Sequence, residues 1–248
     1  ISTVSVKPRL RVALLSTGSE LVEPGTDELP PGAIFNSNRP MLRALLVALG
    51  CTVFDGGNVP DSLEATCEAL AAAAPRADLI LSCGGVSVGE ADHVREAVNR
   101  LGAIDLWKVA IKPGKPFAFG RVGTTPFIGL PGNPASAFVT FLLLVRPWIH
   151  ARQGRAPAPP LAFPVRADFS VSRPGGRDDY LRVSLAEAPS AAISEAAGGI
   201  EAAAQVAAGP VRWARPFPNQ SSGVLSSLTA SAALARVPAG RCVTRGDE

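Results

Sequence analysis

Short apolar runs and helix-like segments alternate along roughly the first 150 residues of the chain. The run 11–16 is compact and apolar, as in a buried strand, whereas 41–49 carries its leucines at helical spacing. We expect strands at 11–16, 52–54, 78–82, 108–111, 117–121 and 127–129, and helices at 41–49, 62–73, 92–101 and 134–149. This alternation predicts an α/β fold in which a doubly wound, mostly parallel sheet carries helices on both faces.

The pattern changes after residue 150. Prolines recur between 154 and 164, which predicts a semi-rigid linker, and the segments beyond it alternate over short stretches separated by glycine and proline. We expect strands at 165–171, 180–185, 211–214 and 232–237, while the alanine-rich stretch 191–208 is compatible with a helix or with strands. The predicted organisation is an extension or linker at 1–8, an α/β domain at 9–150, a proline-rich linker at 151–164 and a small β-barrel-like domain at 165–248.

Composition argues against several classes of protein. The formal charge is only +3, and neither a basic run nor a stripe of aromatic residues is present, so we expect no nucleic-acid partner. The longest apolar run, 135–149, is short for a membrane span and better explained as a buried helix, so no membrane association is expected. The four cysteines form no CxxC pair and only two histidines occur, which indicates reduced thiols, a cytoplasmic location and no zinc site built on imidazoles.

Three lysines, Lys108, Lys112 and Lys115, interrupt the apolar segment 106–120. If the segment is a strand, Lys108 and Lys112 point to the same face about 13 Å apart. Unpaired ammonium groups beside a buried strand are costly, so these side chains should meet carboxylates or an anionic ligand. The alternative is a structural ion pair, or lysines that face solvent from an edge strand.

Polar loops that contain glycine follow three of the expected strands, at 16–20, 55–61 and 82–92. In an open α/β sheet such loops meet at the carboxyl ends of the strands, where ligands bind. Glycine turns let backbone N–H groups approach an oxyanion, so we expect a ligand that carries phosphate. None of the loops is a Walker A or a G-x-G-x-x-G motif, so the general nucleotide-binding motifs are absent.

Glu20, Asp61 and Asp92 lie one on each of these loops. Carboxylates beside phosphates usually need a cation between them, and hard oxygen ligands favour Mg²⁺. The alternative is that each acid caps a helix or lies in its first turn. Finding all three at one end of the sheet favours a magnesium site.

Residues 85–89 also match the G-x-S-x-G nucleophile elbow, with Ser87 as the nucleophile. A serine hydrolase of that type needs a histidine further along the chain. His93 lies in the very next helix and His150 at the end of an apolar helix, so neither is well placed. Covalent labelling of Ser87 by a fluorophosphonate would be needed to revive this interpretation.

Five segments, in their order and spacing, resemble the MoeA/gephyrin E-domain family of molybdopterin molybdenumtransferases. They are TGSEL at 17–21, SN at 37–38, GGVSVGEAD at 84–92, KPGKP at 112–116 and LPGNP at 130–134. Residues 176–182 and 220–228 resemble the C-terminal β domain of that family, so nearly the whole chain is covered. The chain departs from the family at Ser19, where many members have aspartate, at 230–232, and in lacking the N-terminal, dimer-forming region ahead of Ile1.

The resemblance implies an enzyme of molybdenum cofactor biosynthesis that inserts molybdate into adenylylated molybdopterin and releases AMP with the assistance of Mg²⁺. Glu20, Asp61 and Asp92 would serve the cation and the phosphoanhydride, while Lys108, Lys112 and Lys115 would hold phosphate and molybdate. Arg182 and either Ser222 or Ser221 would reach the oxyanion. The residues expected to contact the cofactor are Thr17, Gly18, Ser37, Asn38, Gly84, Gly85, Ser87, Lys115, Pro131, Gly132, Asn133, Arg182 and Ser222.

Two other functions stay open at this point. One is a molybdopterin-binding or adenylylating protein of the MogA/MoaB type, which lacks a β domain, and the other is a non-catalytic scaffold. The resemblance also implies a homodimer for the full-length protein, whose cleft is completed by the N-terminal region of the partner. We therefore expect this chain alone to bind ligands and to turn over poorly.

Overall fold

The computed structural model describes residues 2–25, 28–86, 93–156, 160–187 and 212–248. The chain divides into two compact units, Ile1–Val109 with Pro113–Pro159, and Ala110–Lys112 with Pro160–Glu248. The short segment Ala110–Lys112 therefore belongs to the second unit, although both of its flanks belong to the first.

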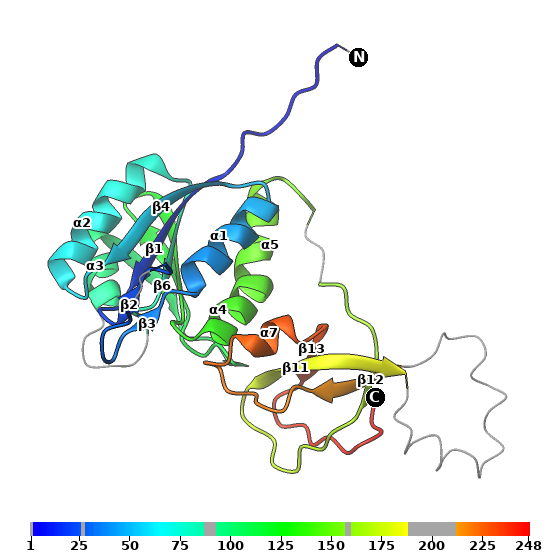
Figure 1. Cartoon of the computed structure of the whole chain (residues 1–248). Coiled ribbons are helices and arrows are strands. Elements are labelled where there is room, and N and C mark those ends of the chain that lie inside the picture. Colours follow the sequence, from blue (N-terminus) through cyan, green and yellow to red (C-terminus); the bar gives the residue numbers. More distant parts are fainter. Residues whose placement is uncertain (1, 26–27, 87–92, 157–159, 188–211) are drawn as a thin grey trace, which may run out of the picture. The chain divides into compact units, whose positions relative to one another are not determined.

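A six-stranded sheet forms the centre of the first unit, with the strand order β4-β1-β5-β9-β8-β6 (Figure 1). Strands β4, β1, β5 and β9 run parallel, and β8 is antiparallel to both of its neighbours. The strands are β1 (Arg11–Thr17), β4 (Thr52–Val59), β5 (Leu79–Cys83), β6 (Gly102–Trp107), β8 (Ala118–Val122) and β9 (Thr125–Leu130), with a separate pair β2 (Leu21–Val22) and β3 (Ile34–Phe35). The mostly parallel α/β fold predicted from the sequence is confirmed.

Alternate residues of the central strands face opposite layers of helices. In β1, Val12 and Leu14 belong to one buried cluster, and Ala13 and Leu15 belong to the other. This is the alternation that a strand covered on both faces requires. Helices α1 (Asn38–Ala48), α4 (Pro134–Thr140) and α5 (Arg146–Arg152) close the first cluster, and α2 (Leu63–Ala73) and α3 (His93–Leu101) close the second, with a short turn η1 (Ala74–Arg76) after α2.

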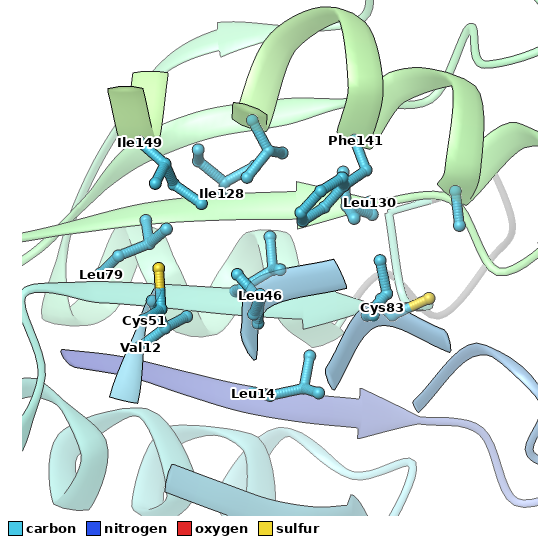
Figure 2. Packing of buried hydrophobic residues seen from close by; sticks show 14 of the residues in the cluster. Val12, Leu14, Leu46, Cys51, Leu79, Cys83, Ile128, Leu130, Phe141 and Ile149 are labelled. Atoms are coloured by element: carbon cyan, nitrogen blue, oxygen red, sulfur yellow. The ribbon is translucent and has the colours of Figure 1, made fainter. Parts of the chain in front are cut away.

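The helix expected at 134–149 continues to Arg152, with a π-helical turn η2 (Phe141–Val145) between α4 and α5. Pro147 follows this turn, and because proline has no N–H, a local widening of the hydrogen-bond ladder accommodates it. By length and composition alone, this stretch of 19 residues with a mean hydropathy of 1.2 is apolar enough to cross a membrane. Phe141 and Ile149 pack in the first cluster, facing the sheet (Figure 2), as in the buried helix that we expected.

The prediction of a strand at 108–111 is wrong. The strand before the lysines is β6, which ends at Trp107 and which the sequence analysis missed because it follows α3 without a loop and lies at the edge of the sheet. Lys108 has a φ of 76°, outside β geometry, and β7 contains only Ile111–Lys112. Strand alternation therefore does not place Lys108 and Lys112 on one face.

A five-stranded sheet forms the second unit, with the order β10-β12-β11-β13 and with β7 paired to β11. Its strands are β10 (Arg166–Ala167), β11 (Asp178–Glu187), β12 (Arg212–Pro216) and β13 (Ala233–Val237), and one short helix, α7 (Ser226–Thr229), accompanies them. Each of the four strands expected beyond the linker has a counterpart with shifted bounds. The ambiguous stretch 191–208 lies outside the described residues.

Leu46 provides a test of the first cluster. Its side chain is fully buried, whereas Val47, the next residue of α1, is 53% exposed. We expect Leu46→Ala to lower the free energy of unfolding of the first unit by about 2–5 kcal/mol, because it removes buried methyl groups and leaves a cavity. The measurement is urea unfolding followed by circular dichroism, with one transition fitted for each unit. Val47→Ala is the matched control, and an equal loss in the two variants would contradict this packing.

Candidate functional site

The ends of β1, β5 and β9 form one edge of the first sheet, which we call the carboxyl edge and define by Thr17, Cys83 and Leu130. The N–H of Gly84 donates to the carbonyl of Leu130 at 3.0 Å. Gly84 and Gly85 have φ angles of 94° and 65°, which favour glycine. A Cβ at Gly84 would lie 2.3 Å from the carbonyl oxygen of Thr17. Backbone therefore packs directly on backbone at this edge, a reason for glycine at 84 that the sequence did not reveal.

Asn38, the first residue of α1, joins the carboxyl edge to the loop after β9. Its buried amide Nδ2 donates to the carbonyl of Gly132 at 2.5 Å and to Cys83 Sγ at 3.3 Å, and Cys83 Sγ donates to the carbonyl of Pro131 at 3.3 Å. Burial raises the pKa of Cys83 to about 12, so the thiol stays protonated and neutral near pH 7. Asn38 thus has a positioning role in the structure that its motif alone did not indicate.

Several polar atoms at the carboxyl edge have no partner within the described residues. They are Ser16 Oγ, Thr17 Oγ1 and Asn38 Oδ1, all buried. Ser37 precedes α1 and makes no capping hydrogen bond through its side chain, and Asn133 holds the corresponding position before α4. Because buried polar atoms are normally satisfied, atoms of this kind suit a polar ligand.

The turn after β1 holds Gly18 and Glu20, and an asparagine that the sequence analysis did not single out supports it. Asn58 Nδ2 donates to the carbonyl of Gly18 at 3.1 Å and to that of Leu21 at 3.5 Å. A Cβ at Gly18 would lie 2.7 Å from Glu20 Oε2, so the Glu20 carboxylate lies over this glycine. The only signal for Asn58 in the sequence was its place in the glycine-containing segment 55–61. We expected a loop there, but β4 continues through Asn58 to Val59.

The acidic residues proposed for magnesium are only partly placed. Glu20 and Asp61 are exposed, and neither side chain has a hydrogen bond or ion pair with a described residue. Asp92, like Ser87, lies outside the described residues. Within the described ranges, no group of three or more histidine, cysteine, aspartate or glutamate residues is close enough to hold a metal ion.

The three lysines divide between the two units. Lys108 and Lys115 belong to the first unit, where both are exposed and where the N–H of Val109 donates to the carbonyl of Lys115 at 3.1 Å. Lys112 belongs to the second unit, and its Nζ lies 2.8 Å from Asp179 Oδ2. Lys112 thus has the kind of carboxylate partner that the sequence analysis named as the alternative to a ligand. The backbone of Lys108 is strained, because its φ is positive and lysine has a Cβ. Strained backbone of this kind is more frequent at functional sites than elsewhere.

Arg182, in the middle of β11, is a buried cation whose hydrogen bonds all go to neutral groups among the described residues. Its side chain is 1% exposed, with Nε donating to Ser227 Oγ at 3.2 Å and Nη2 to the carbonyl of Ser221 at 3.0 Å. The side chain of Gln220 binds the backbone of Arg182 through two hydrogen bonds. The N–H of Arg182 donates to Gln220 Oε1 at 3.0 Å, and Gln220 Nε2 donates to the carbonyl of Arg182 at 2.9 Å. Burial lowers the pKa of Arg182, against the opposing effect of Asp179, but a guanidinium stays charged. Ser222 is half-buried nearby in sequence.

Gln220 and Ser227 are the residues of this cluster that sequence reasoning missed. Both lie in the segment 220–228 that carried the family resemblance, but nothing in their spacing indicated that they position Arg182. Only the fold reveals their role: β11 pairs with β12, and the N–H of Phe217, just after β12, donates to the carbonyl of Arg182 at 2.8 Å.

Comparison with known proteins gives a consistent result. A family model described as "Probable molybdopterin binding domain" matches residues 13–151. The molybdopterin molybdenumtransferase of Haemophilus influenzae is 44% identical over 183 residues, which are 73% of this chain and 45% of that protein. The molybdenum cofactor synthesis protein cinnamon of Drosophila melanogaster is 38% identical over 180 residues, which are 71% of this chain and 29% of that protein.

Among solved structures, a molybdopterin biosynthesis moeA protein from Pyrococcus horikoshii matches with a TM-score of 0.72 at 26% identity, covering 96% of this chain and 53% of that chain. The chain spans about half the length, or less, of the relatives that it matches. The similarity covers both units, and it confirms the resemblance drawn from the motifs.

The close packing at Gly84 can be tested by substitution. We expect Gly84→Ala to lower the free energy of unfolding of the first unit by more than about 2 kcal/mol, because a Cβ would meet the Thr17 carbonyl in addition to the strain of positive φ. Gly50→Ala is the control, since Gly50 has a φ of 77° and a Cβ there would meet nothing within 4 Å. Chemical unfolding of both variants measures the difference. If Gly84→Ala costs no more than Gly50→Ala, the backbone contact is not tight.

Proposed function

Because this chain belongs to the family of probable molybdopterin-binding domains, we propose that it acts in molybdenum cofactor biosynthesis as a molybdopterin molybdenumtransferase. The proposed reaction inserts molybdate into adenylylated molybdopterin and releases AMP. The observation that carries the proposal is the carboxyl edge. There, segments that match the transferase motifs supply buried polar atoms without a partner among the described residues, and the main chain at Gly84 lies against that at Thr17.

The carboxyl edge would bind the pterin and its phosphate through neutral groups. Thr17 offers a hydroxyl, and Gly18 and Gly85 offer N–H groups. Gly84 keeps the main chain close beside them, since its own N–H donates to Leu130. The loop that Asn38 holds in place offers Pro131, Gly132 and Asn133. Fixed dipoles of this kind stabilise an anion without reorganisation during the reaction. Ser37 and Ser87 complete the proposed contacts.

The cations would act on the phosphoanhydride and on molybdate. Lys108 and Lys115 are exposed ammonium groups that would neutralise the charge developing on the departing AMP. Arg182 and Ser222 would hold the molybdate oxyanion. The family resemblance groups Lys112 with them, but Lys112 pairs with Asp179 on the other face of β11 and would not share this contact. For Arg182 the physical reason is clear, because a buried guanidinium with neutral hydrogen-bond partners gains from a dianion nearby.

Glu20, Asp61 and Asp92 would hold Mg²⁺ in this proposal. Glu20 and Asp61 are exposed carboxylates without a cationic partner among the described residues, and hard oxygen donors of this kind suit the ion. The ion would supply positive charge beside the phosphoanhydride.

As the family resemblance implies, we further propose a cytoplasmic homodimer for the full-length protein.

The test is AMP release from adenylylated molybdopterin by the chain in the presence of Mg²⁺, with and without molybdate. We expect release that depends on molybdate, and a loss of about tenfold or more in Lys108→Ala, since one charge-assisted contact in the transition state is removed. Lys7→Ala is the matched control, because Lys7 is an exposed lysine of the same unit that the proposal does not use. Binding of adenylylated molybdopterin is measured in parallel.

Three results would contradict this proposal. AMP formed from ATP and molybdopterin would favour the adenylylating function of the MogA/MoaB type. Binding of neither ligand would favour a scaffold. Equal losses of activity and thermal stability in Lys108→Ala would assign that lysine a structural role.

A further inference from the structure

A second group of cations surrounds a cavity of about 460 Å³ in the second unit. We call it the arginine pocket and define it by Lys112, Arg173, Arg177, Asp179 and Arg241, which line it together with the glycines of the loop before β11. All of its lining residues belong to the second unit. Four of these side chains are positive and one is negative.

The carboxylate of the arginine pocket is already engaged. Asp179 Oδ2 accepts from Lys112 Nζ at 2.8 Å, so this pair is neutral as a whole. Arg177 Nη1 donates to the carbonyl of Ile111 at 3.2 Å, and Arg241 Nη2 donates to the main-chain oxygen of Glu248 at 3.3 Å. Arg173 is exposed and makes no hydrogen bond or ion pair with a described residue. Arg173 and Arg177 therefore face one cavity without a carboxylate partner in the part of the chain that the structure describes, whereas Arg241 is held by an oxygen of Glu248.

Other acids of the same unit are held elsewhere. Asp168 accepts from both Arg215 and Arg245, at 2.9 and 2.8 Å. Asp178, next to Asp179 in sequence, accepts from Arg236 at 2.8 Å and from the N–H of Ala239 at 2.9 Å. Arg215, Arg245 and Arg236, outside the pocket, are thus matched with acids, while Arg173 and Arg177 are not matched with any described acid, which indicates that the excess positive charge of the pocket is local.

The walls of the arginine pocket are built before any ligand arrives. The N–H of Gly240 donates to the carbonyl of Gly175 at 2.9 Å, which joins the loop before β11 to the loop after β13. Val171 and Val243 form an isolated antiparallel bridge beside them. A Cβ at Gly175 or Gly176 would meet nothing within 4 Å, so the backbone there is open to a ligand. A preformed site loses less entropy on binding.

The arginine pocket is separate from the Arg182 cluster. Asp179 and Arg182 are three residues apart on β11, so their side chains leave opposite faces of the strand. Arg182 does not line the cavity, and its hydrogen-bond partners Ser221 and Ser227 do not line it either.

We propose that the arginine pocket binds a tetrahedral oxyanion dianion, either as free phosphate or as the terminal group of a small phosphate monoester. Guanidinium groups bind such an oxyanion through pairs of parallel N–H donors, which a lysine cluster does not offer. The cavity exceeds the volume of a bare tetrahedral ion and suits a small molecule that carries one. The proposal does not depend on the transferase function.

The experiment is calorimetric titration of the whole chain with inorganic phosphate and, separately, with phenyl phosphate, at about 0.1 M NaCl so that distant charges are screened. We expect saturable binding of one equivalent, tighter for phenyl phosphate if the natural ligand is a monoester and equal for the two if it is the free ion. Arg177→Gln should weaken binding by about tenfold, the loss of one charge-assisted pair. Arg212→Gln is the control, since Arg212 is an exposed arginine of the same unit outside the pocket.

A substitution that is expected to strengthen phosphate binding, where Arg177→Gln weakens it, makes the test sharper. Asp179→Asn removes the negative charge that lines the pocket and releases Lys112, so it should tighten phosphate binding several-fold. Unchanged or weaker binding in Asp179→Asn would overturn the proposal, as would equal losses in Arg177→Gln and Arg212→Gln. Lys108→Ala should retain phosphate binding even if the chain releases no AMP, which keeps this proposal distinct from the transferase. Circular dichroism of each variant checks that the second unit is folded.

Discussion

The approach of Gly84 to the carbonyl of Thr17 is the contact on which the candidate site depends. No side chain fits between β1 and the start of the loop after β5, so the main chains of two neighbouring strands end in direct contact. That contact brings the Thr17 hydroxyl and the carbonyl of Leu130 to one edge of the sheet. Asn38 then connects the next loop to the same edge.

The two units offer an anion different kinds of partner. At the carboxyl edge of the first unit the placed groups are neutral dipoles, including an amide, hydroxyls and a thiol kept protonated by burial. In the second unit the groups that could bind an anion are mainly guanidiniums, one buried among neutral partners and three around a cavity that Lys112 also lines. Neutral dipoles set the orientation of a ligand, whereas an arginine fork adds charge and selects a planar or tetrahedral oxyanion.

The sequence predicted the architecture of the first unit well because its signals are local. The continuous apolar run of β1 and the helical leucine spacing of α1 follow from covering a sheet on both faces, so they can be read in a window of about ten residues. The prediction failed between 102 and 111, because the edge strand β6, with weak burial, ends at Trp107, and Lys108 at positive φ interrupts the strand that we expected at 108–111. Edge strands bury little, so their sequences carry little pattern.

The amino-acid sequence by itself determined most of the strands and helices of the first unit, β6 excepted, where its glycine turns fall and which family it resembles, because these depend on neighbours along the chain. Only the tertiary structure decided that Lys112 pairs with Asp179 in the second unit, whereas Lys108 and Lys115 belong to the first. It also decided that Asn58, Gln220 and Ser227 form hydrogen bonds with residues far from them in sequence. The physical reason is that an ion pair or a buried hydrogen bond is made wherever the folded backbone brings donor and acceptor together, and sequence separation does not limit that distance.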